Sequence, residues 1–258
     1  MYIKSDFPAL SRMTHVTLAD LKSVSLMNRI DTKFVTNISR LGKILDDACS
    51  YGYKVCEIAG QRLLHYTSIY YDTGTLDMFR AHRNGKKTRQ KIRVRTYHIN
   101  GCTYLEIKNK QNTGRTKKKR IEIPENTALQ ISSDTEAVKF IEKYSIFNIY
   151  DIAPETSTDF FRITLTDKDL TERVTIDINL SFINHRNYMT SSLSDLVIIE
   201  IKQDGKNLST MKDILLQNRV FPLRISKYCL SVILTEQDIH PGRYNEKLRH
   251  LYKITTQK

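Results

Sequence analysis

The chain has 258 residues, 40% of them hydrophobic, which is enough for one large domain with a sizeable core. Its 41 Lys and Arg residues outnumber 28 Asp and Glu, and the net charge of +13 predicts a polyanionic partner such as nucleic acid, a phosphorylated molecule, polyphosphate or an anionic membrane surface. No apolar run approaches the ~18–20 residues that cross a bilayer, and the N-terminus shows no apolar signal region, so we expect a cytoplasmic protein without a transmembrane segment.

The first half of the chain predicts mainly strands. Helices are expected to begin at Thr17 and at Ser39, where a hydroxyl can cap the first turn. Asn100-Gly101 is a strong hairpin signal. Strands are predicted over residues 29–35, 65–72, 90–97, 103–109 and 117–123.

The second half continues with a helix led by Ser133 and Asp134, a hairpin over 159–166 and 172–180, and a strand over 196–202. Further helices are expected from Ser209 and from Ser226, followed by a basic tail over 241–258. Strands outnumber helices and are joined by short turns. The pattern therefore favours an antiparallel α+β fold over a doubly wound parallel sheet, in a single domain over 1–258.

Charged and apolar residues alternate along these strands, as in Lys91-Ile92-Arg93-Val94-Arg95. Successive side chains of a strand point to opposite faces, so each strand presents one charged and one apolar face. In the same way, Arg173, Thr175, Asp177 and Asn179 oppose Val174, Ile176, Ile178 and Leu180.

The charged faces carry more bases than acids, whereas an ordinary solvated face mixes signs because like charges repel. The bases are Arg29, Lys33, Lys91, Arg93, Arg95, Lys108, Lys118, Arg120, Arg162, Arg173 and Lys202, against Asp31, Glu106, Glu122, Asp177 and Glu200. We therefore predict a closed antiparallel barrel of about eight strands, with the charges inside and the helices packed outside.

Motifs for other kinds of site are absent or weak in this sequence. No Gly-rich P-loop and no paired His spacing for zinc occur, and the four cysteines lack metal-finger spacing, so they are expected to be reduced thiols. Asp72-Thr73-Gly74 matches the aspartic-protease tripeptide in a single copy and is interpreted as a turn after a strand. Few aromatic platforms accompany the basic residues, so nucleic acid is not the expected partner.

In order along the chain, these residues resemble the vacuolar transporter chaperone (VTC) domain, the polyphosphate polymerase branch of the triphosphate tunnel metalloenzymes in the CYTH-like superfamily. The resemblance covers residues from about 25 to 235. The matching pieces are Arg29-x-Asp31-x-Lys33, Tyr70-Tyr71-Asp72-Thr73, Lys91-x-Arg93-x-Arg95, Glu106-x-Lys108, Lys117–Arg120, Phe161-Arg162, Arg173-Val174-Thr175-x-Asp177, Glu200-x-Lys202 and Arg224-x-Ser226-Lys227.

The resemblance implies a basic tunnel that binds ATP and inorganic polyphosphate with Mn²⁺ or Mg²⁺. The residues it places at the transferred phosphate are Lys33, Arg93, Arg95, Lys108, Lys118, Arg162, Arg173 and Lys202. Strand parity favours Lys118 over Lys119 for this group. The residues expected to hold other phosphates are Arg29, Lys91, Arg120, Arg224, Ser226 and Lys227, and Glu200 is the expected metal ligand.

The implied activity is transfer of the γ-phosphate of ATP to a growing polyphosphate chain. Related triphosphatases open with Glu-x-Glu-x-Lys, and Arg29 stands in place of the first Glu, which argues against that branch. Two alternatives stay open: a tunnel triphosphatase that hydrolyses inorganic or nucleoside triphosphate, and a sensor that binds polyphosphate or nucleotide without turnover. Whether a membrane protein is a partner is also left open.

Overall fold

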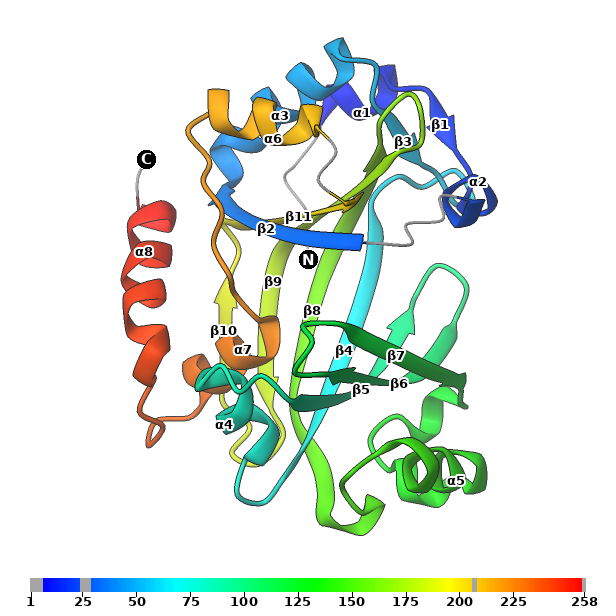
Figure 1. Ribbon diagram of the computed structural model, residues 1–258, viewed down its shortest axis with the longest axis vertical. Coiled ribbons are helices and arrows are strands. Elements are labelled where there is room, and N and C mark those ends of the chain that lie inside the picture. Colours follow the sequence, from blue (N-terminus) through cyan, green and yellow to red (C-terminus); the bar gives the residue numbers. More distant parts are fainter. Residues whose placement is uncertain (1–6, 24–28, 206–207, 257–258) are drawn as a thin grey trace.

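The computed structural model describes residues 7–23, 29–205 and 208–256 and contains one mainly antiparallel sheet with helices around it (Figure 1). The strands are β1 (His15–Val16), β2 (Arg29–Asn37), β3 (Lys54–Cys56), β4 (Leu64–Thr73), β5 (Arg89–Tyr97), β6 (Cys102–Lys110), β7 (Thr116–Glu122), β8 (Ile152–Thr166), β9 (Glu172–Asn184), β10 (Thr190–Leu193) and β11 (Leu196–Asp204). The main path runs β2-β11-β9-β8-β4-β5-β6-β7, and only β1 and β3 pair in parallel. The α+β class is confirmed.

The helices begin close to the predicted positions. They are α1 (Pro8–Arg12), α2 (Leu18–Ser23), α3 (Ile38–Ser50), α4 (Asp77–Arg83), α5 (Thr135–Tyr144), α6 (Thr210–Gln217), α7 (Lys227–Thr235) and α8 (Asn245–Thr256), with short 3₁₀ turns η1 (Glu125–Thr127), η2 (Ile131–Ser133), η3 (Ile149–Asp151) and η4 (Gly242–Tyr244). Ser209 and Ser226 cap α6 and α7 as predicted. Asn37, not Ser39, caps α3, because its side chain accepts a hydrogen bond from the Ser39 amide.

The prediction of a closed eight-stranded barrel is wrong. The sheet has eleven strands, and its terminal strands β2 and β7 do not pair with each other within the described residues. The free side of β2 is instead met by the segment after α6, where the Leu223 amide donates to the Lys33 carbonyl (2.8 Å). This segment leads directly into α7 (Figure 1). Part of the edge of β2 is thus covered without barrel closure.

The sheet is nevertheless strongly curved. β6 and β11 lie five strands apart along the path, which corresponds to about 24 Å in a flat sheet. Even so, the charge of Lys108 on β6 lowers the pKa of Glu200 on β11, and the charge of Lys33 on β2 lowers the pKa of Lys91 on β5. Because the effect of a charge on a pKa falls off with distance, the two ends of the sheet lie near each other across its inner side.

The outer, apolar faces of the strands are covered by helices, as predicted. Ile92, Val94, Leu105 and Ile107 of β5 and β6 belong to one buried cluster with Phe140 and other residues of α5. At the other end of the sheet, a second buried cluster joins β8, β9 and β11 to α1, α3 and α6. Burial of each large apolar side chain contributes ~1.5–3 kcal/mol, so these clusters stabilise the curved sheet while its charged side stays inside.

The alternation predicted for β9 breaks after Ile178. Phe161 on β8 pairs with Ile178, but Asp159, two residues away, pairs with Ser181, so β9 contains one extra residue. Asn179 adopts a left-handed conformation at this bulge (φ 53°). Because of the bulge, Leu180 and Phe182 turn to the inner side of the sheet, where they join residues of α7 in the first cluster. The predicted placement of Leu180 opposite the charged face is therefore wrong.

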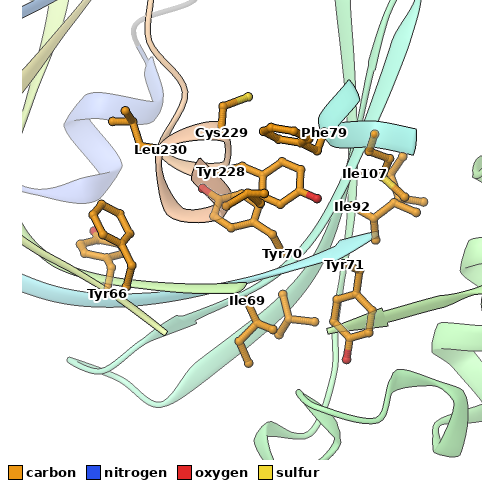
Figure 2. Close-up of a cluster of buried hydrophobic side chains, with 14 of the residues drawn as sticks. Tyr66, Ile69, Tyr70, Tyr71, Phe79, Ile92, Ile107, Tyr228, Cys229 and Leu230 are labelled. Carbon is orange, nitrogen blue, oxygen red and sulfur yellow. The ribbon is translucent and has the colours of Figure 1, made fainter. Parts of the chain in front are cut away.

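Helix α7 lies on the inner side of the sheet, held by a buried aromatic and polar network. The rings of Tyr70 and Tyr228 stack with centroids 5.0 Å apart, and Figure 2 shows them beside Phe79. The buried Asp72 carboxylate accepts hydrogen bonds from the amides of Met78 (2.9 Å) and Phe79 (2.8 Å) and from the Tyr228 hydroxyl. Burial raises the pKa of Asp72. Asp72-Thr73-Gly74 is therefore a structural turn, as predicted.

The basic tail is a packed helix. Leu251 of α8 is buried, and the Asn37 side chain donates to the Ile254 carbonyl (3.0 Å). The contacts tie the C-terminal helix to the end of β2. None of the helices in the described ranges has the length and apolar character needed to cross a bilayer.

Candidate anion-binding site

The inner side of the curved sheet brings charged side chains from seven strands and one helix together. We call this set the cationic face. Its members are Lys33 (β2), Lys91, Arg93 and Arg95 (β5), Glu106 and Lys108 (β6), Lys118 (β7), Arg162 (β8), Asp177 (β9), Glu200 and Lys202 (β11) and Lys227 (α7). The bases outnumber the acids in this set, as the sequence predicts.

Two buried carboxylates hold pairs of cations in place. Arg93 donates to Glu106 from Nε (2.8 Å), and Lys118 pairs with the other oxygen of the same carboxylate. Burial raises the pKa of Glu106, but the charges of Arg93, Arg95 and Lys118 outweigh this effect, and its pKa lies well below the usual range. Glu106 therefore stays ionised and fixes the cations around it.

Asp177 has the same role at the other end of the cationic face. Arg162 donates to its two oxygens from Nε (2.6 Å) and Nη2 (2.8 Å), and Lys227 also pairs with it. Burial would raise the pKa of Asp177, but Arg162 and Lys227 bring it below the usual range. Because Lys227 is the first residue of α7, this ion pair anchors the helix to the sheet.

An aromatic pair orients the guanidinium groups. Tyr66 on β4 and Phe160 on β8 stack with centroids 5.6 Å apart. Arg95 lies 5.8 Å from the Tyr66 centroid and Arg162 lies 5.2 Å from it, while Lys227 lies 4.5 Å from Phe160. Such stacking limits the motion of the cations without neutralising their charge. Our sequence reasoning missed both aromatics, although Tyr66 shares strand parity with Ser68, the hydrogen-bond acceptor of Arg95.

Lys91 lies where α7 begins. Its ammonium donates to the Ser226 hydroxyl (3.0 Å), which also caps the helix by accepting from the Cys229 amide. The Tyr70 and Tyr228 rings lie 5.6 and 5.8 Å from Lys91 Nζ. Burial lowers the pKa of Lys91 to about 8, so its charge changes around that pH. The helix N-terminus adds a positive partial charge at the same place.

Glu200 lies between two lysines, 3.1 Å from Lys202 Nζ and 3.6 Å from Lys33 Nζ. Burial would raise the pKa of Glu200, but Lys202 and Lys33 bring it well below the usual range. Mg²⁺ is commonly held by one or two carboxylates together with substrate phosphates. As an ionised, partly exposed carboxylate, Glu200 fits such a site when phosphate oxygens supply the other ligands. No cluster of three metal-ligating side chains within the described residues includes it.

Lys108 lacks the anionic partner that its neighbours have. In the described part of the chain, no hydrogen bond or ion pair is found for its ammonium group. The nearby charge of Arg93 and burial together bring the pKa of Lys108 well below its usual value, and they outweigh the opposing charge of Glu106. A partly buried lysine that lies among other cations costs folding free energy. An anion bound among these cations would remove that cost.

Some predicted residues lie away from this centre. Arg120 is exposed and covers the Tyr104 ring (4.6 Å), and Arg224 is exposed in the segment before α7. Arg173 pairs in register with Lys202 and lies near Cys56, where burial raises the thiol pKa and the charge of Arg173 offsets part of the rise. It therefore lies toward one end of the face. Lys118 points inward, whereas Lys119 lies 5.6 Å from the Tyr144 ring of α5 on the outer side, as strand parity predicts. The Arg29 side chain is outside the described part of the structure.

The sequence model of the VTC domain matches residues 28–235, which include every member of the cationic face. The chain belongs to the VTC domain family. No curated protein matches this VTC domain in sequence.

Solved structures resemble the VTC domain only distantly. A candidate adenylate cyclase from Bacillus halodurans is 14% identical with a TM-score of 0.47 and covers 78% of this chain and 96% of its own. A candidate adenylyl cyclase from Hippeastrum, described as having a dominant triphosphatase activity, is 14% identical with a TM-score of 0.46 and covers 82% and 100%. A Pyrococcus horikoshii protein is 15% identical with a TM-score of 0.45 and covers 79% and 96%. These likenesses are too distant to support a functional argument.

Proposed function

We propose that this VTC domain is a metal-dependent polyphosphate polymerase that transfers the γ-phosphate of ATP to the end of an inorganic polyphosphate chain. Lys108 is the observation that carries the proposal. A partly buried ammonium group beside Arg93 costs free energy that a bound polyanion would offset. Membership of the VTC family narrows that polyanion to triphosphate and polyphosphate.

The arrangement can promote phosphoryl transfer by position and charge alone. Arg93 and Arg162 are fixed by Glu106 and Asp177, so their remaining donors are oriented before a phosphate arrives. Lys33, Lys108 and Lys202 supply positive charge from opposite ends of the curved sheet. The acceptor phosphate oxygen is the nucleophile, and the reaction therefore needs no protein nucleophile.

Glu200 would hold Mn²⁺ or Mg²⁺ together with phosphate oxygens. When bound, such an ion neutralises phosphate charge and aligns the reacting groups. Lys202 and Lys33 orient the Glu200 carboxylate and keep it ionised. At one end of the face, Lys91, Ser226 and Lys227 present a hydroxyl and two ammonium groups beside the start of α7, suited to holding the distal part of a phosphate chain.

The test is to incubate the purified chain with ATP and Mn²⁺ and to size the phosphate products on a gel. Long chains are expected. Release of orthophosphate alone would show a triphosphatase, and binding of ATP without any product would show a sensor; either result would overturn the proposal.

Substitutions separate binding from turnover. Glu200→Gln should reduce metal-dependent synthesis by at least tenfold while retaining tripolyphosphate binding, whereas Arg93→Ala combined with Arg95→Ala should abolish binding measured by calorimetry. Lys43→Ala, which removes an exposed charge from α3, is the matched control and should change neither. Synthesis at the parental rate in Glu200→Gln would contradict the metal assignment.

A further inference from the structure

A second cluster of chemically active side chains lies outside the cationic face. His65 comes from β4, Asp159 from β8, and His98 directly follows β5. One ligating atom from each of the three residues lies within 4.8 Å of the others. His65 Nε2 is 2.7 Å from Asp159 Oδ1, and the imidazole rings of His65 and His98 stack with centroids 4.1 Å apart. Three separate segments of the chain therefore converge on one point.

This point is on the outer side of the sheet. Tyr66 and Ser68 contact Arg95 on the inner side, so the intervening positions of β4, including His65 and Thr67, face outward. On β8, Phe160 and Arg162 face inward, which places Asp159 outward. The cluster is separated from the cationic face by the thickness of the sheet, and the proposed phosphate chemistry does not use it.

Neighbouring groups hold the three side chains in place. The Thr67 hydroxyl donates to Asp159 Oδ2 (2.7 Å) and lies 2.8 Å from His98 Nε2. Phe161 stacks against the other side of the His65 ring, with centroids 4.8 Å apart. In protein metal sites, contacts of this kind orient the ligating carboxylates and imidazoles.

We propose that His65, His98 and Asp159 bind a divalent transition-metal ion, Zn²⁺ being the ion that best matches two imidazoles and one carboxylate. Around a tetrahedral Zn²⁺ with ligand bonds of about 2.1 Å, ligand atoms lie about 3.4 Å apart. The His65–Asp159 hydrogen bond would open slightly and the exposed His98 would move inward, both by side-chain rotation. The fourth position would hold water.

The site would join the end of the β5–β6 hairpin to the two long central strands. Phosphoryl transfer itself does not depend on it, because Zn²⁺ would be bound on the opposite side of the sheet from Glu200. Binding of the metal alone can therefore be measured without any assay of turnover.

The test is titration of the full chain, purified with a chelator and then freed of it, with ZnCl₂ in a calorimeter. One equivalent should bind, and His98→Ala and Asp159→Asn should each weaken binding by at least tenfold. His15→Ala removes an exposed histidine elsewhere, and Glu200→Gln removes the inner carboxylate; both should bind Zn²⁺ like the parent.

Co²⁺ provides a spectroscopic check, because a tetrahedral site with these ligands gives visible absorption that His98→Ala should abolish. His98 is exposed, so this variant is expected to fold, which thermal unfolding would verify. The proposal would be overturned by the absence of saturable Zn²⁺ uptake, by parental affinity in both site variants, or by loss of binding in Glu200→Gln.

Discussion

On the inner side of this sheet, some charged residues favour anion binding but lower the stability of the ligand-free protein. Glu106 and Asp177 each pair with two cations, whereas the like charge of Arg93 and burial outweigh the attraction of Glu106 for Lys108. Residues with such perturbed pKa values are typical of functional sites, where a bound ligand supplies the compensating charge.

Replacement of Lys108 with Met should therefore raise stability and lower affinity together. We expect an increase of roughly 1 kcal/mol or more in the free energy of unfolding without ligand, and a loss of about tenfold in tripolyphosphate affinity, equivalent to ~1.4 kcal/mol. Chemical denaturation and calorimetry measure the two effects. Lys43→Met on the outer surface should alter neither, and a Lys108→Met protein that is less stable than the parent would show that Lys108 is not repelled.

Lys91 should make ligand binding depend on pH. Its protonated form attracts phosphate, and burial lowers its pKa to about 8, so affinity for ATP should be highest below that pH and should fall as pH rises through it. A bound anion favours the protonated form of Lys91, so the decrease in affinity occurs at a somewhat higher pH. Lys91→Arg keeps its charge to much higher pH, and calorimetry from pH 7 to pH 10 should show a flatter profile for this variant. Identical profiles would exclude Lys91 as the titrating group.

Among the secondary-structure elements, α7 links the fold to the site. Its cap residue Ser226 also accepts from Lys91, and its first residue pairs with Asp177. Helix α6 has an equivalent cap, Ser209, whose side chain accepts from the Lys212 amide far from the cationic face. The two serines thus have the same structural role but different surroundings.

Ser226→Ala and Ser209→Ala should each reduce the free energy of unfolding by about 1 kcal/mol, because each removes a helix cap. Only Ser226→Ala should also weaken binding of tripolyphosphate, by several-fold, since only this hydroxyl lies beside Lys91. Denaturation curves and calorimetry on both variants give the comparison. Equal affinity in the two would remove Ser226 from the binding site.

In the whole molecule, an open sheet brings its two ends face to face. Lys33 and Lys202 come from one end of the strand path, and Arg93 and Lys108 come from the other. A phosphate chain that contacts both groups would tie together strands that share no hydrogen bonds.

Binding of polyphosphate should therefore slow amide hydrogen exchange in β2, β11, β5 and β6 at the same time, because local opening of either end would break ligand contacts. Strand β10, which pairs with the end of β9, is an internal control, and its amide exchange should be unchanged. Exchange measured by mass spectrometry with and without polyphosphate tests this. Protection confined to one end would show that the ligand does not bridge the sheet.

The strand alternation and cap residues were sufficient to predict the antiparallel α+β class, the inward direction of Lys118, and the cationic character of one side of the sheet. These features follow from local rules, since strand parity and helix capping depend on a few neighbouring residues. The same rules failed at Asn179, where a bulge reversed the parity of β9, because a left-handed residue in a strand depends on the pairing around it.

Tertiary structure alone decided which charges meet. The sequence does not reveal that Lys227 joins Arg162 at Asp177, that Tyr66 and Phe160 support the arginines, or that His65, His98 and Asp159 converge. Each of these sets joins segments far apart in the chain. Nor could it decide that the sheet stays open, with the segment before α7 covering part of the edge of β2. Alternation fixes the face on which a side chain lies, whereas curvature and long-range packing fix its neighbours.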